Sequence, residues 1–338
     1  MTIKILYIGN KLAKHGNNPT GIDVVGKYFE SEGYRMQYAS EKKNKFLRIL
    51  EMLYKVLTVK RVDYVLIDTY STSNFWYAFM VSQLCRLFNK KYIPICHGGN
   101  LNKRIKKNPY CSKLIFSKAY ANVAPSAYTY NMLKELDMPN LFQISNTIEV
   151  AKYPFRNASE FRPRLLWVRA LVSIYNPEMA IRAFKKVKEK YPDATLTMVG
   201  PFKEIAREKM EQMARKHQVE VLFTGKLSKE EWIKLSEDYD IFLNTTNIDN
   251  MPVSVLEAMA LGLVVLSTNV GGVPYIIENN KTGLLVNADD SEEMAAKIEY
   301  IVDNQDFSEQ LTKNARNFVE KLDWKNIKND WYKLLHER

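Results

Sequence analysis

The sequence predicts an α/β protein made of two doubly wound, Rossmann-like domains that face each other across a cleft. Short apolar runs alternate with helical stretches along the whole chain, as in parallel sheets whose strands are buried on both faces. A length of 338 residues allows two domains with a core each. The stretch 146–164 lacks periodicity and holds two prolines, which places the junction between the domains there.

The expected elements follow one plan in both halves. In the first half we expect strands at 5–9, 64–68, 92–96, 121–125 and 141–145, and helices near 21–33, 41–60, 74–89, 112–119 and 126–136. In the second half we expect strands at 165–169, 195–200, 221–225, 240–245, 263–268 and 283–286. We expect helices there at 177–190, 203–217, 228–236 and 291–303, and a short helix that ends at Gly262. Repeated βα units imply right-handed crossovers.

These elements define the expected domains. An N-terminal domain covers 1–150, a linker 151–164 and a C-terminal domain 165–320. A last helix at 321–338 is expected to return to the N-terminal domain.

The composition indicates a globular protein, with 46% hydrophobic and 26% charged residues. The three cysteines, Cys85, Cys96 and Cys111, form no C-x-x-C pair, which favours reduced thiols over a disulfide framework or a zinc site. The first apolar run ends at Gly9 and predicts a strand, not a signal peptide, and no run reaches the roughly 18 residues of a membrane span. We expect a cytoplasmic protein, at most peripheral on the inner face of the membrane.

The net charge of +11 is concentrated in one half of the chain. Residues 1–155 hold 23 Lys and Arg against 10 Asp and Glu, whereas the remainder holds 26 against 28. Residues 41–61 form a basic stretch with an apolar helical face, and 103–107 add a second basic cluster. This pattern predicts an anionic membrane surface or an anionic lipid-linked acceptor as partner, and the alternative is a packed helix with a solvated basic face. Nucleic acid is not expected, because no reader motif is present.

Residues 249–262, DNMPVSVLEAMALG, predict a loop that enters a short helix. At such a helix start, free main-chain N–H groups and the positive end of the helix dipole attract phosphate. Asn250 and Met251 have N–H groups to offer, whereas Pro252 has none.

Two acids flank this helix start. Glu257 lies inside the helix and offers two acceptor oxygens, which suit a vicinal diol such as a ribose. Asp249 precedes the helix, on the side of the phosphate where an attached sugar would lie. The structural alternatives are a salt bridge for Glu257 and a helix cap for Asp249.

From FLNTTNIDNMPVSVLEAMALG to VVLSTNVGGVPYIIENNKTGLLV, the sequence resembles the donor-binding region of retaining GT-B glycosyltransferases of family four, the glycosyl transferases group 1. The shared pattern is two acids seven residues apart, then A-M-x-x-G-x-x-V, a G-G turn and N-x-x-x-G-L-L-V. The likeness is loose in the first half and close from about residue 165. It implies metal-independent transfer of a sugar, a hexose by expectation, from a nucleotide sugar to a glycan or lipid-linked acceptor in polysaccharide biosynthesis. No cofactor is implied beyond this co-substrate.

The resemblance implies roles for the acids and for Arg169. Glu257 would bind the ribose hydroxyls, the 250–252 backbone the diphosphate, and Asp249 the transferred sugar. The family usually has Glu where this chain has Asp249, and lysine where it has Tyr175. Arg169 corresponds to the arginine that contacts the diphosphate, a task that suits a guanidinium fork; a structural ion pair is the alternative.

The resemblance also extends to the remaining site residues. Gly225 and Lys226 fall in a turn that would line the base pocket. His97 follows a strand directly and would contact the sugar or the acceptor, with a structural histidine as the alternative. Gly21 ends a glycine-bearing loop that would reach the donor phosphate or the acceptor; an ordinary loop is the alternative. The expected catalytic residues are therefore His97, Asp249 and Arg169, and no metal ligands are expected.

Three other functions remain open. An inverting GT-B enzyme would share the fold but needs a general base. A non-catalytic nucleotide-sugar-binding protein would explain Asp249 and Tyr175 in place of the usual residues. A dinucleotide-dependent dehydrogenase is disfavoured, because G-x-G-x-x-G is missing after the first strand.

Overall fold

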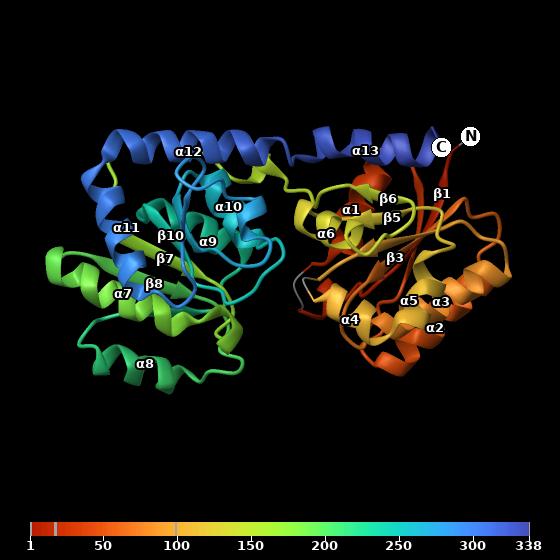
Figure 1. Cartoon of the computed structure of the whole chain (residues 1–338), viewed down its shortest axis with the longest axis horizontal. Coiled ribbons are helices and arrows are strands. Elements are labelled where there is room, and N and C mark those ends of the chain that lie inside the picture. Colours follow the sequence, from red (N-terminus) through yellow and green to blue (C-terminus); the bar gives the residue numbers. More distant parts are fainter. Residues whose placement is uncertain (1, 17–18, 99, 338) are drawn as a thin grey trace. The chain divides into compact units, whose positions relative to one another are not determined.

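The computed structural model describes residues 2–16, 19–98 and 100–337. The chain divides into two compact units: unit 1 is Met1–Thr147 with Ile327–Arg338, and unit 2 is Ile148–Asn326. Each unit contains a six-stranded sheet, and every recorded strand pair is parallel (Figure 1). The prediction of two doubly wound, Rossmann-like domains is thereby confirmed. The stretch 151–164, expected as a linker, belongs to unit 2.

The sheet of unit 1 has the strand order β2-β1-β3-β4-β5-β6. Its strands are β1 (Lys4–Ile8), β2 (Arg35–Ala39), β3 (Tyr64–Thr69), β4 (Tyr92–Cys96), β5 (Asn122–Ala124) and β6 (Leu141–Gln143). Its helices are η1 (Ala13–His15), α1 (Gly21–Ser31), α2 (Lys45–Thr58), α3 (Phe75–Leu87), α4 (Leu101–Lys107), α5 (Pro109–Phe116), α6 (Ala127–Lys134) and most of α13 (Trp324–His336). The strand order reverses between β1 and β3, so the switch point, where open α/β sheets bind ligands, lies there.

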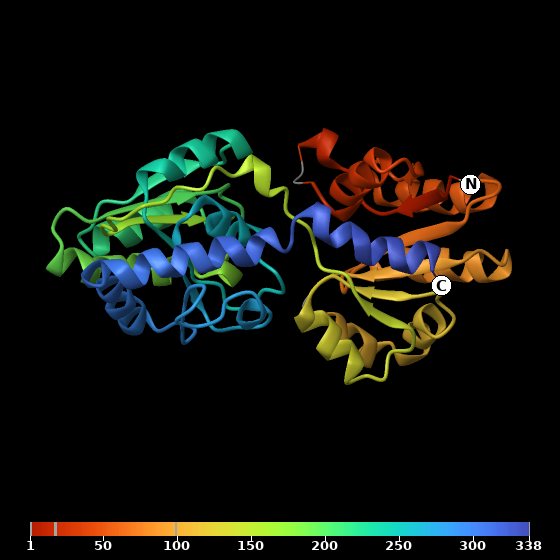
Figure 2. The same cartoon turned by 90° about the horizontal axis from the view of Figure 1, so that it is seen from above.

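Helix α13 packs within unit 1, although it is the last element of the chain. Its Trp331 ring meets Phe29 of α1 edge to face at 5.3 Å, and Tyr64 of β3 donates a hydrogen bond to the Leu335 carbonyl over 3.0 Å. Figure 2 shows this helix, in dark blue, running along unit 1. On the opposite face of the sheet, α2 and α3 cover the strands through buried residues such as Met52 and Val81.

The sheet of unit 2 has the strand order β12-β11-β10-β7-β8-β9. Its strands are β7 (Arg164–Val168), β8 (Thr195–Val199), β9 (Leu222–Gly225), β10 (Ile241–Asn244), β11 (Val264–Thr268) and β12 (Leu284–Val286). Its helices are η2 (Val150–Lys152), η3 (Ser173–Tyr175), α7 (Pro177–Lys190), α8 (Arg207–Lys216), α9 (Lys229–Leu235), η4 (Ser236–Asp238), α10 (Val253–Leu261), η5 (Val273–Tyr275), α11 (Ser291–Asp303) and α12 (Gln305–Glu320). The switch point of this sheet lies between β7 and β10.

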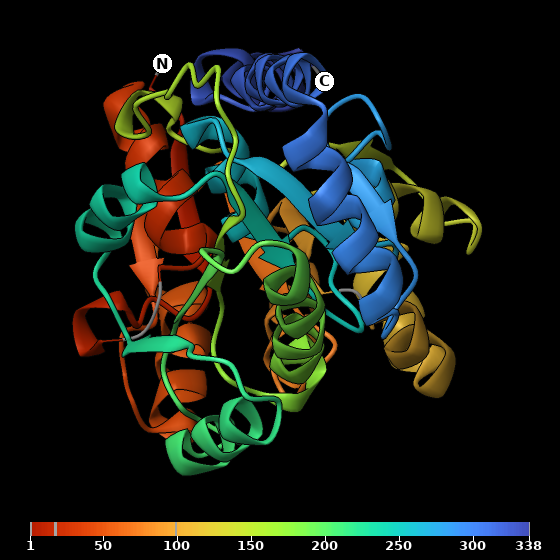
Figure 3. The same ribbon diagram turned by 90° about the vertical axis from the view of Figure 1, so that its left-hand side faces the viewer.

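Alternate strand residues of unit 2 face two different helix layers. Leu165 and Trp167 pack with α7, α8 and α11, whereas Leu166 and Phe242 pack with α9, α10 and α12. Figure 3, in which unit 2 is turned toward the viewer, shows helices on both sides of the sheet. Both faces are buried, which explains why the strands read as continuous apolar runs.

The sequence prediction missed β2, α4 and α12. Strand β2 lies at an edge of its sheet and has only one fully buried residue, Ala39, so it lacks an apolar run. Helix α4 is short and lysine-rich, and its sequence was read only as a basic cluster. The helix expected near 112–119 starts earlier, because Pro109 occupies the first turn of α5.

The three cysteines are free thiols. Cys85 and Cys96 are buried, and burial raises the pKa of each to about 12. At neutral pH both remain protonated, so neither is expected to act as a nucleophile.

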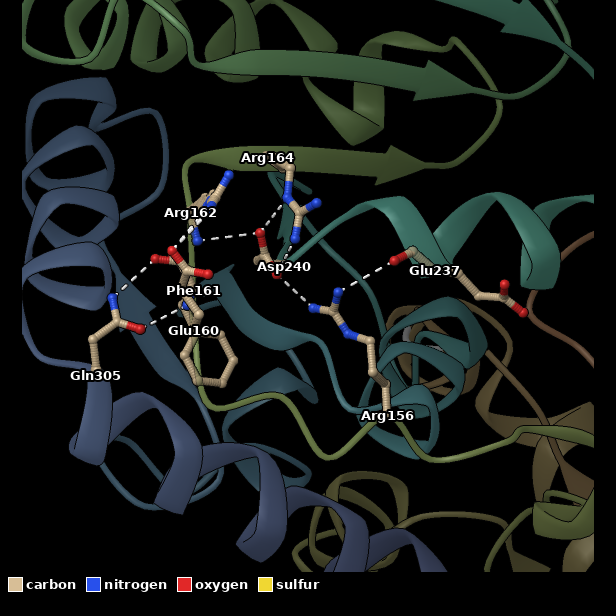
Figure 4. Close-up of polar contacts among 8 residues, drawn as sticks. All are labelled: Arg156, Glu160, Phe161, Arg162, Arg164, Glu237, Asp240 and Gln305. Carbon is tan, nitrogen blue, oxygen red and sulfur yellow. Dashed lines mark hydrogen bonds and ion pairs between the residues drawn. The ribbon is translucent and has the colours of Figure 1, made fainter.

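A buried carboxylate fixes the segment 156–164 to the amino-terminal edge of the sheet in unit 2. Asp240 is fully buried and accepts hydrogen bonds from the guanidinium groups of Arg156, at 2.5 Å, and Arg164, at 2.6 and 2.9 Å. The main-chain N–H of Arg162 donates to the same carboxylate over 3.1 Å. Figure 4 shows this cluster, beside which Gln305 of α12 bonds both main-chain groups of Phe161. The cluster therefore ties the start of unit 2 to its sheet.

We expect Asp240→Asn to lower the free energy of unfolding by about 2–4 kcal/mol, because two guanidinium groups lose their anion; the arginines are partly exposed, so the loss is smaller than for a fully buried pair. Urea unfolding measures the change. The neighbouring Asp238 is exposed, and Asp238→Asn should change stability by less than about 0.5 kcal/mol. Equal effects of the two variants would contradict the assigned role.

Candidate functional site

Helix α10 is buried around its whole circumference. Every residue from Ser254 to Leu261 is buried, and Val253 at the start is exposed. Gly262 ends the helix in the left-handed region, at φ 87°, where a Cβ would collide with the Arg156 carbonyl oxygen. The apolar sequence and the glycine stop therefore fix a short helix whose amino end emerges at the carboxyl edge of the sheet.

The amino end of α10 presents unused hydrogen-bond donors. The main-chain N–H groups of Met251, Val253 and Ser254 have no partner among the described residues. The Ser254 hydroxyl is also buried and unpartnered in this part of the chain. The N–H of Asn250, expected to be a donor for phosphate, is bonded to Asp249 Oδ1 at 2.7 Å. Together with the helix dipole, these donors make the start of α10 suitable for binding an anion. We call residues 249–257 the α10 site.

The glycine pair Gly271–Gly272 packs against the loop that precedes α10. Gly272 N–H donates to the Asp249 carbonyl over 2.8 Å, and a Cβ on Gly272 would collide with the Asn250 carbonyl oxygen. Gly271 has a φ of 54°. The close packing of the G-G turn therefore sets the position of the loop that precedes α10.

Arg169 follows β7 and Asp249 lies in the loop after β10. Because these two strands are paired and parallel, both residues lie at the switch point of the sheet. The Arg169 guanidinium forms an ion pair with the Asp249 carboxylate and lies over the Tyr175 ring, 4.2 Å from its centroid. Burial lowers the pKa of Arg169 from its ordinary value, while Tyr175 and Glu257 oppose this effect. Its Nε is buried with no hydrogen-bond partner among the described residues. Arg169 thus retains capacity to bind an anion.

The helix-cap alternative for Asp249 is not what the structure shows. Residue 252 is the N-cap of α10, and no side chain caps it with a hydrogen bond. The ion-pair alternative for Arg169 does occur, with Asp249 as the partner.

Glu257 is buried and already has two partners. The Tyr153 hydroxyl donates to Oε1 over 2.8 Å, and the Lys229 ammonium pairs with the same oxygen. The salt bridge that sequence reasoning kept as an alternative is therefore present. Oε2 has no recorded bond among the described residues, so one carboxylate oxygen is left for a hydroxyl group.

In unit 1, His97 follows β4 and joins a buried carboxylate. Its Nε2 lies 3.0 Å from Asp68 Oδ1, and the Tyr7 hydroxyl donates to the same oxygen over 3.0 Å. The imidazole stacks on Tyr70 at 5.1 Å between centroids. Gly21, the first residue of α1, lies against this group, because a Cβ there would be 3.4 Å from His97 Nε2. The structure therefore places His97 and Gly21 together at the switch point of unit 1.

The remaining predicted residues lie at strand ends. Gly225 ends β9 in the left-handed region, at φ 75°, and its carbonyl accepts from Gly200 N–H over 2.8 Å. Lys226 follows it and is exposed. Gly98, directly after His97, has a φ of 96°, in the left-handed region that favours glycine.

Several residues of these sites were not singled out from the sequence, among them the donors Val253 and Ser254, the stacked Tyr70, and the partners Asp68, Tyr7, Tyr153 and Lys229. Asp68 carried a visible signal, because it is an acid at the carboxyl end of an apolar strand. Tyr7, Tyr153 and Lys229 carried none, since only the fold brings them beside Asp68 or Glu257.

Two features are absent from the residues that the structure describes. No helix in this part of the chain is long and apolar enough to cross a membrane. No group of three or more His, Cys, Asp or Glu there is arranged to hold a metal ion.

Residues 151–318 match the model of a family described as "Glycosyl transferases group 1". This segment belongs to that family. It contains the whole α10 site and both of its acids, so the suspected resemblance is confirmed and unit 2 is a glycosyltransferase group 1 domain.

Curated relatives match about half of this chain. The sulfoquinovosyl transferase SQD2 of Arabidopsis thaliana is 30% identical over 164 residues, which cover 46% of this chain and 31% of the relative. A glycogen synthase of Mycobacterium tuberculosis is 27% identical over 213 residues, covering 60% of this chain and 50% of the relative. The matched part thus spans 31% and 50% of the length of these two relatives.

Solved structures resemble the group 1 domain together with unit 1. Anabaena HepE in complex with UDP-glucose has a TM-score of 0.77 at 16% identity, covering 99% of this chain and 100% of that chain. Sucrose-phosphate synthase from Thermosynechococcus elongatus has a TM-score of 0.78 at 15% identity, covering 99% of both chains. At these identities the likeness shows the fold, and it is that of GT-B proteins.

The stack of Tyr175 on Arg169 is testable by a double-mutant cycle. We expect urea unfolding of Tyr175→Leu, Arg169→Met and the double variant to give a coupling free energy of about 0.5–2 kcal/mol, because the ring faces a desolvated cation. Tyr175→Phe, in place of Leu, keeps the aromatic face and should reduce the coupling to near zero in its own cycle. Strictly additive effects of the Leu and Met changes would contradict the stack.

Proposed function

We propose that this chain is a retaining, metal-independent glycosyltransferase that moves a sugar from a nucleotide sugar to a hydroxyl of a glycan or lipid-linked acceptor. The family of residues 151–318 supports the reaction class. In the proposal unit 2 holds the donor and unit 1 the acceptor side. Catalysis uses no cofactor beyond the nucleotide-sugar co-substrate.

The observation that carries the proposal is the cluster of unused donors at the start of α10. A diphosphate would accept from the Met251, Val253 and Ser254 N–H groups, and Arg169 would supply a cation beside it. Donors and charge held in place before the reaction stabilise a leaving diphosphate without reorganisation, and they do so most strongly where water is excluded.

Glu257 would bind the ribose of the nucleotide. One ribose hydroxyl would donate to Oε2. The other would donate to Oε1, in place of the Lys229 ammonium or beside it. Asp249 would contact the transferred sugar from its place beside Arg169. Backbone groups at Gly225 and Lys226 would line the base pocket, which the carboxyl end of β9 supports.

The proposed chemistry is a single group transfer. The bond from the anomeric carbon to the phosphate oxygen breaks, and a bond from that carbon to the acceptor oxygen forms on the same face. The proton of the acceptor hydroxyl passes to the leaving phosphate oxygen. An inverting enzyme is the second candidate, because His97 with its buried carboxylate partner has the arrangement of a general base.

Product stereochemistry separates these candidates. We expect a screen of uridine, guanosine and adenosine diphosphate sugars with glycan and lipid-linked acceptors to give transfer in EDTA, with the donor's anomeric configuration kept in the product. Proton NMR of the product measures the configuration. A product with the opposite anomeric configuration would contradict the retaining proposal and favour the inverting enzyme. Donor binding without transfer to any acceptor would favour a non-catalytic nucleotide-sugar-binding protein.

Glu257→Gln should weaken binding of the nucleotide sugar by about 1–3 kcal/mol, because a charged acceptor of the ribose hydroxyls is lost. Isothermal titration calorimetry measures the affinity. The exposed Glu230 on neighbouring α9 serves as the control, and Glu230→Gln should leave affinity unchanged. If Glu257→Gln also binds as tightly as the native protein, the ribose assignment is wrong.

We further propose that unit 1 binds an anionic membrane surface. Helix α2 packs inward through Met52 and Val56, yet a second apolar stripe faces outward. The exposed residues of this stripe are Phe46, at 69%, Leu47, Leu50, Tyr54, at 62%, and Leu57. An apolar stripe beside basic residues suits a lipid interface better than water.

Changing Lys42, Lys43 and Lys45 to Glu should reduce co-sedimentation with phosphatidylglycerol vesicles by about tenfold or more, because each lysine near an anionic surface adds attraction. Three exposed lysines of unit 2, Lys203, Lys216 and Lys234, provide a matched charge reversal that should change little. Absence of vesicle binding by the native protein would refute the membrane proposal.

A further inference from the structure

Asp68 is a buried carboxylate at the switch point of unit 1. It lies in β3, one residue before its end, and its side chain is fully buried. Oδ1 receives two hydrogen bonds, from Tyr7 and His97, whereas Oδ2 is buried without a partner among the described residues. A buried oxygen without a partner costs free energy, so a carboxylate kept only for stability would be expected to be fully bonded.

The surroundings of Asp68 are shaped to hold it. A Cβ on Gly9, directly after β1, would lie 2.6 Å from Asp68 Oδ2. On Gly21 a Cβ would lie 3.2 Å from the Tyr7 hydroxyl and 3.4 Å from His97 Nε2. The Tyr77 hydroxyl bonds the Asp68 carbonyl over 2.6 Å. Three neighbouring strands and two glycines thus keep space for this carboxylate and the imidazole that it meets.

The pairing with Asp68 determines how His97 presents its ring. An ionised carboxylate only accepts hydrogen bonds, so the ring nitrogen facing it, Nε2, must carry a proton. In the neutral imidazole Nδ1 then has a lone pair, and it has no hydrogen-bond partner among the described residues. Stacking on Tyr70 fixes the plane of the ring.

We infer that Asp68 is a positioning residue, which sets the tautomer of His97 so that Nδ1 accepts a hydrogen bond from a sugar hydroxyl. The substrate part of this inference rests on the proposed function. The inference holds for a retaining and for an inverting enzyme. In both cases Nδ1 can accept a hydrogen bond from a hydroxyl of the transferred sugar or of the acceptor substrate.

The tautomer itself is testable without activity. Two-bond proton–nitrogen correlation spectra of the full chain labelled with nitrogen-15, at about pH 8.5, where ordinary imidazoles are neutral, distinguish the two forms. The chain has four histidines, and His97→Gln identifies the relevant signals by their loss. We expect the form protonated at Nε2 in the native protein, and a shift toward the form protonated at Nδ1 in Asp68→Asn.

Kinetics test the consequence. Asp68→Asn should lower kcat/KM by about 10- to 100-fold, because the charged acceptor of the His97 hydrogen bond becomes a neutral amide. Its dissociation constants for UDP, GDP and ADP should change less than about twofold, since the α10 site lies in the other unit. Tyr92→Phe is the matched control: it removes a buried tyrosine bond to a main-chain carbonyl, that of Ile115, at the end of β4 far from His97, and should keep the tautomer unchanged and kcat/KM within about threefold.

Each outcome decides the inference. A native His97 protonated at Nδ1 would overturn it, even if Asp68→Asn failed to fold. A loss of activity in Asp68→Asn with an unchanged tautomer would also overturn it, because the effect would then be structural. If the native protein bound no nucleotide at all, the proposed function would fail, while the tautomer result would stand by itself.

Discussion

The pairing of β7 with β10 is the constraint on which the proposed donor site depends. These strands lie side by side, with Leu165 opposite Ile241 and Trp167 opposite Leu243, although some seventy residues separate them. Because both run in the same direction, the loops that follow them meet at one edge. This brings Arg169 to Asp249 and aims the start of α10 at the same place. Without this pairing, residues that define the site would have no common location.

The charged side chains at this site are paired with one another. Arg169 lies against Asp249, and Glu257 lies against Lys229. An unpaired charge there would be costly, so the pairs lower the cost of keeping a reactive site folded. A bound nucleotide sugar would exchange partners: phosphate for the carboxylate beside Arg169, and hydroxyls for the ammonium beside Glu257. In the proposed function the same groups would thus serve stability before binding and recognition after it.

Sequence patterns predicted most of the fold because its signals are local. Buried parallel strands give apolar runs, and helix ends carry Pro177 or Gly262. The edge strand β2 was missed because it buries little, and α4 because its lysines concealed a helix. The site acids were visible from their spacing around α10. Their partners Lys229 and Tyr153 were not, because contact across 28 and 104 residues is a property of the folded chain. Asp68 was interpreted only as part of a strand, although an acid at the carboxyl end of an apolar strand is a visible signal; its contact with His97 across 29 residues is a property of the folded chain.

A crystal structure of the protein in complex with a nucleotide sugar tests the central claim most directly. The account predicts diphosphate oxygens within hydrogen-bond distance of the Met251, Val253 and Ser254 amides, the Arg169 guanidinium beside them, and ribose hydroxyls on Glu257. A ligand bound elsewhere, with the start of α10 left unoccupied and Glu257 still held by Lys229, would contradict it.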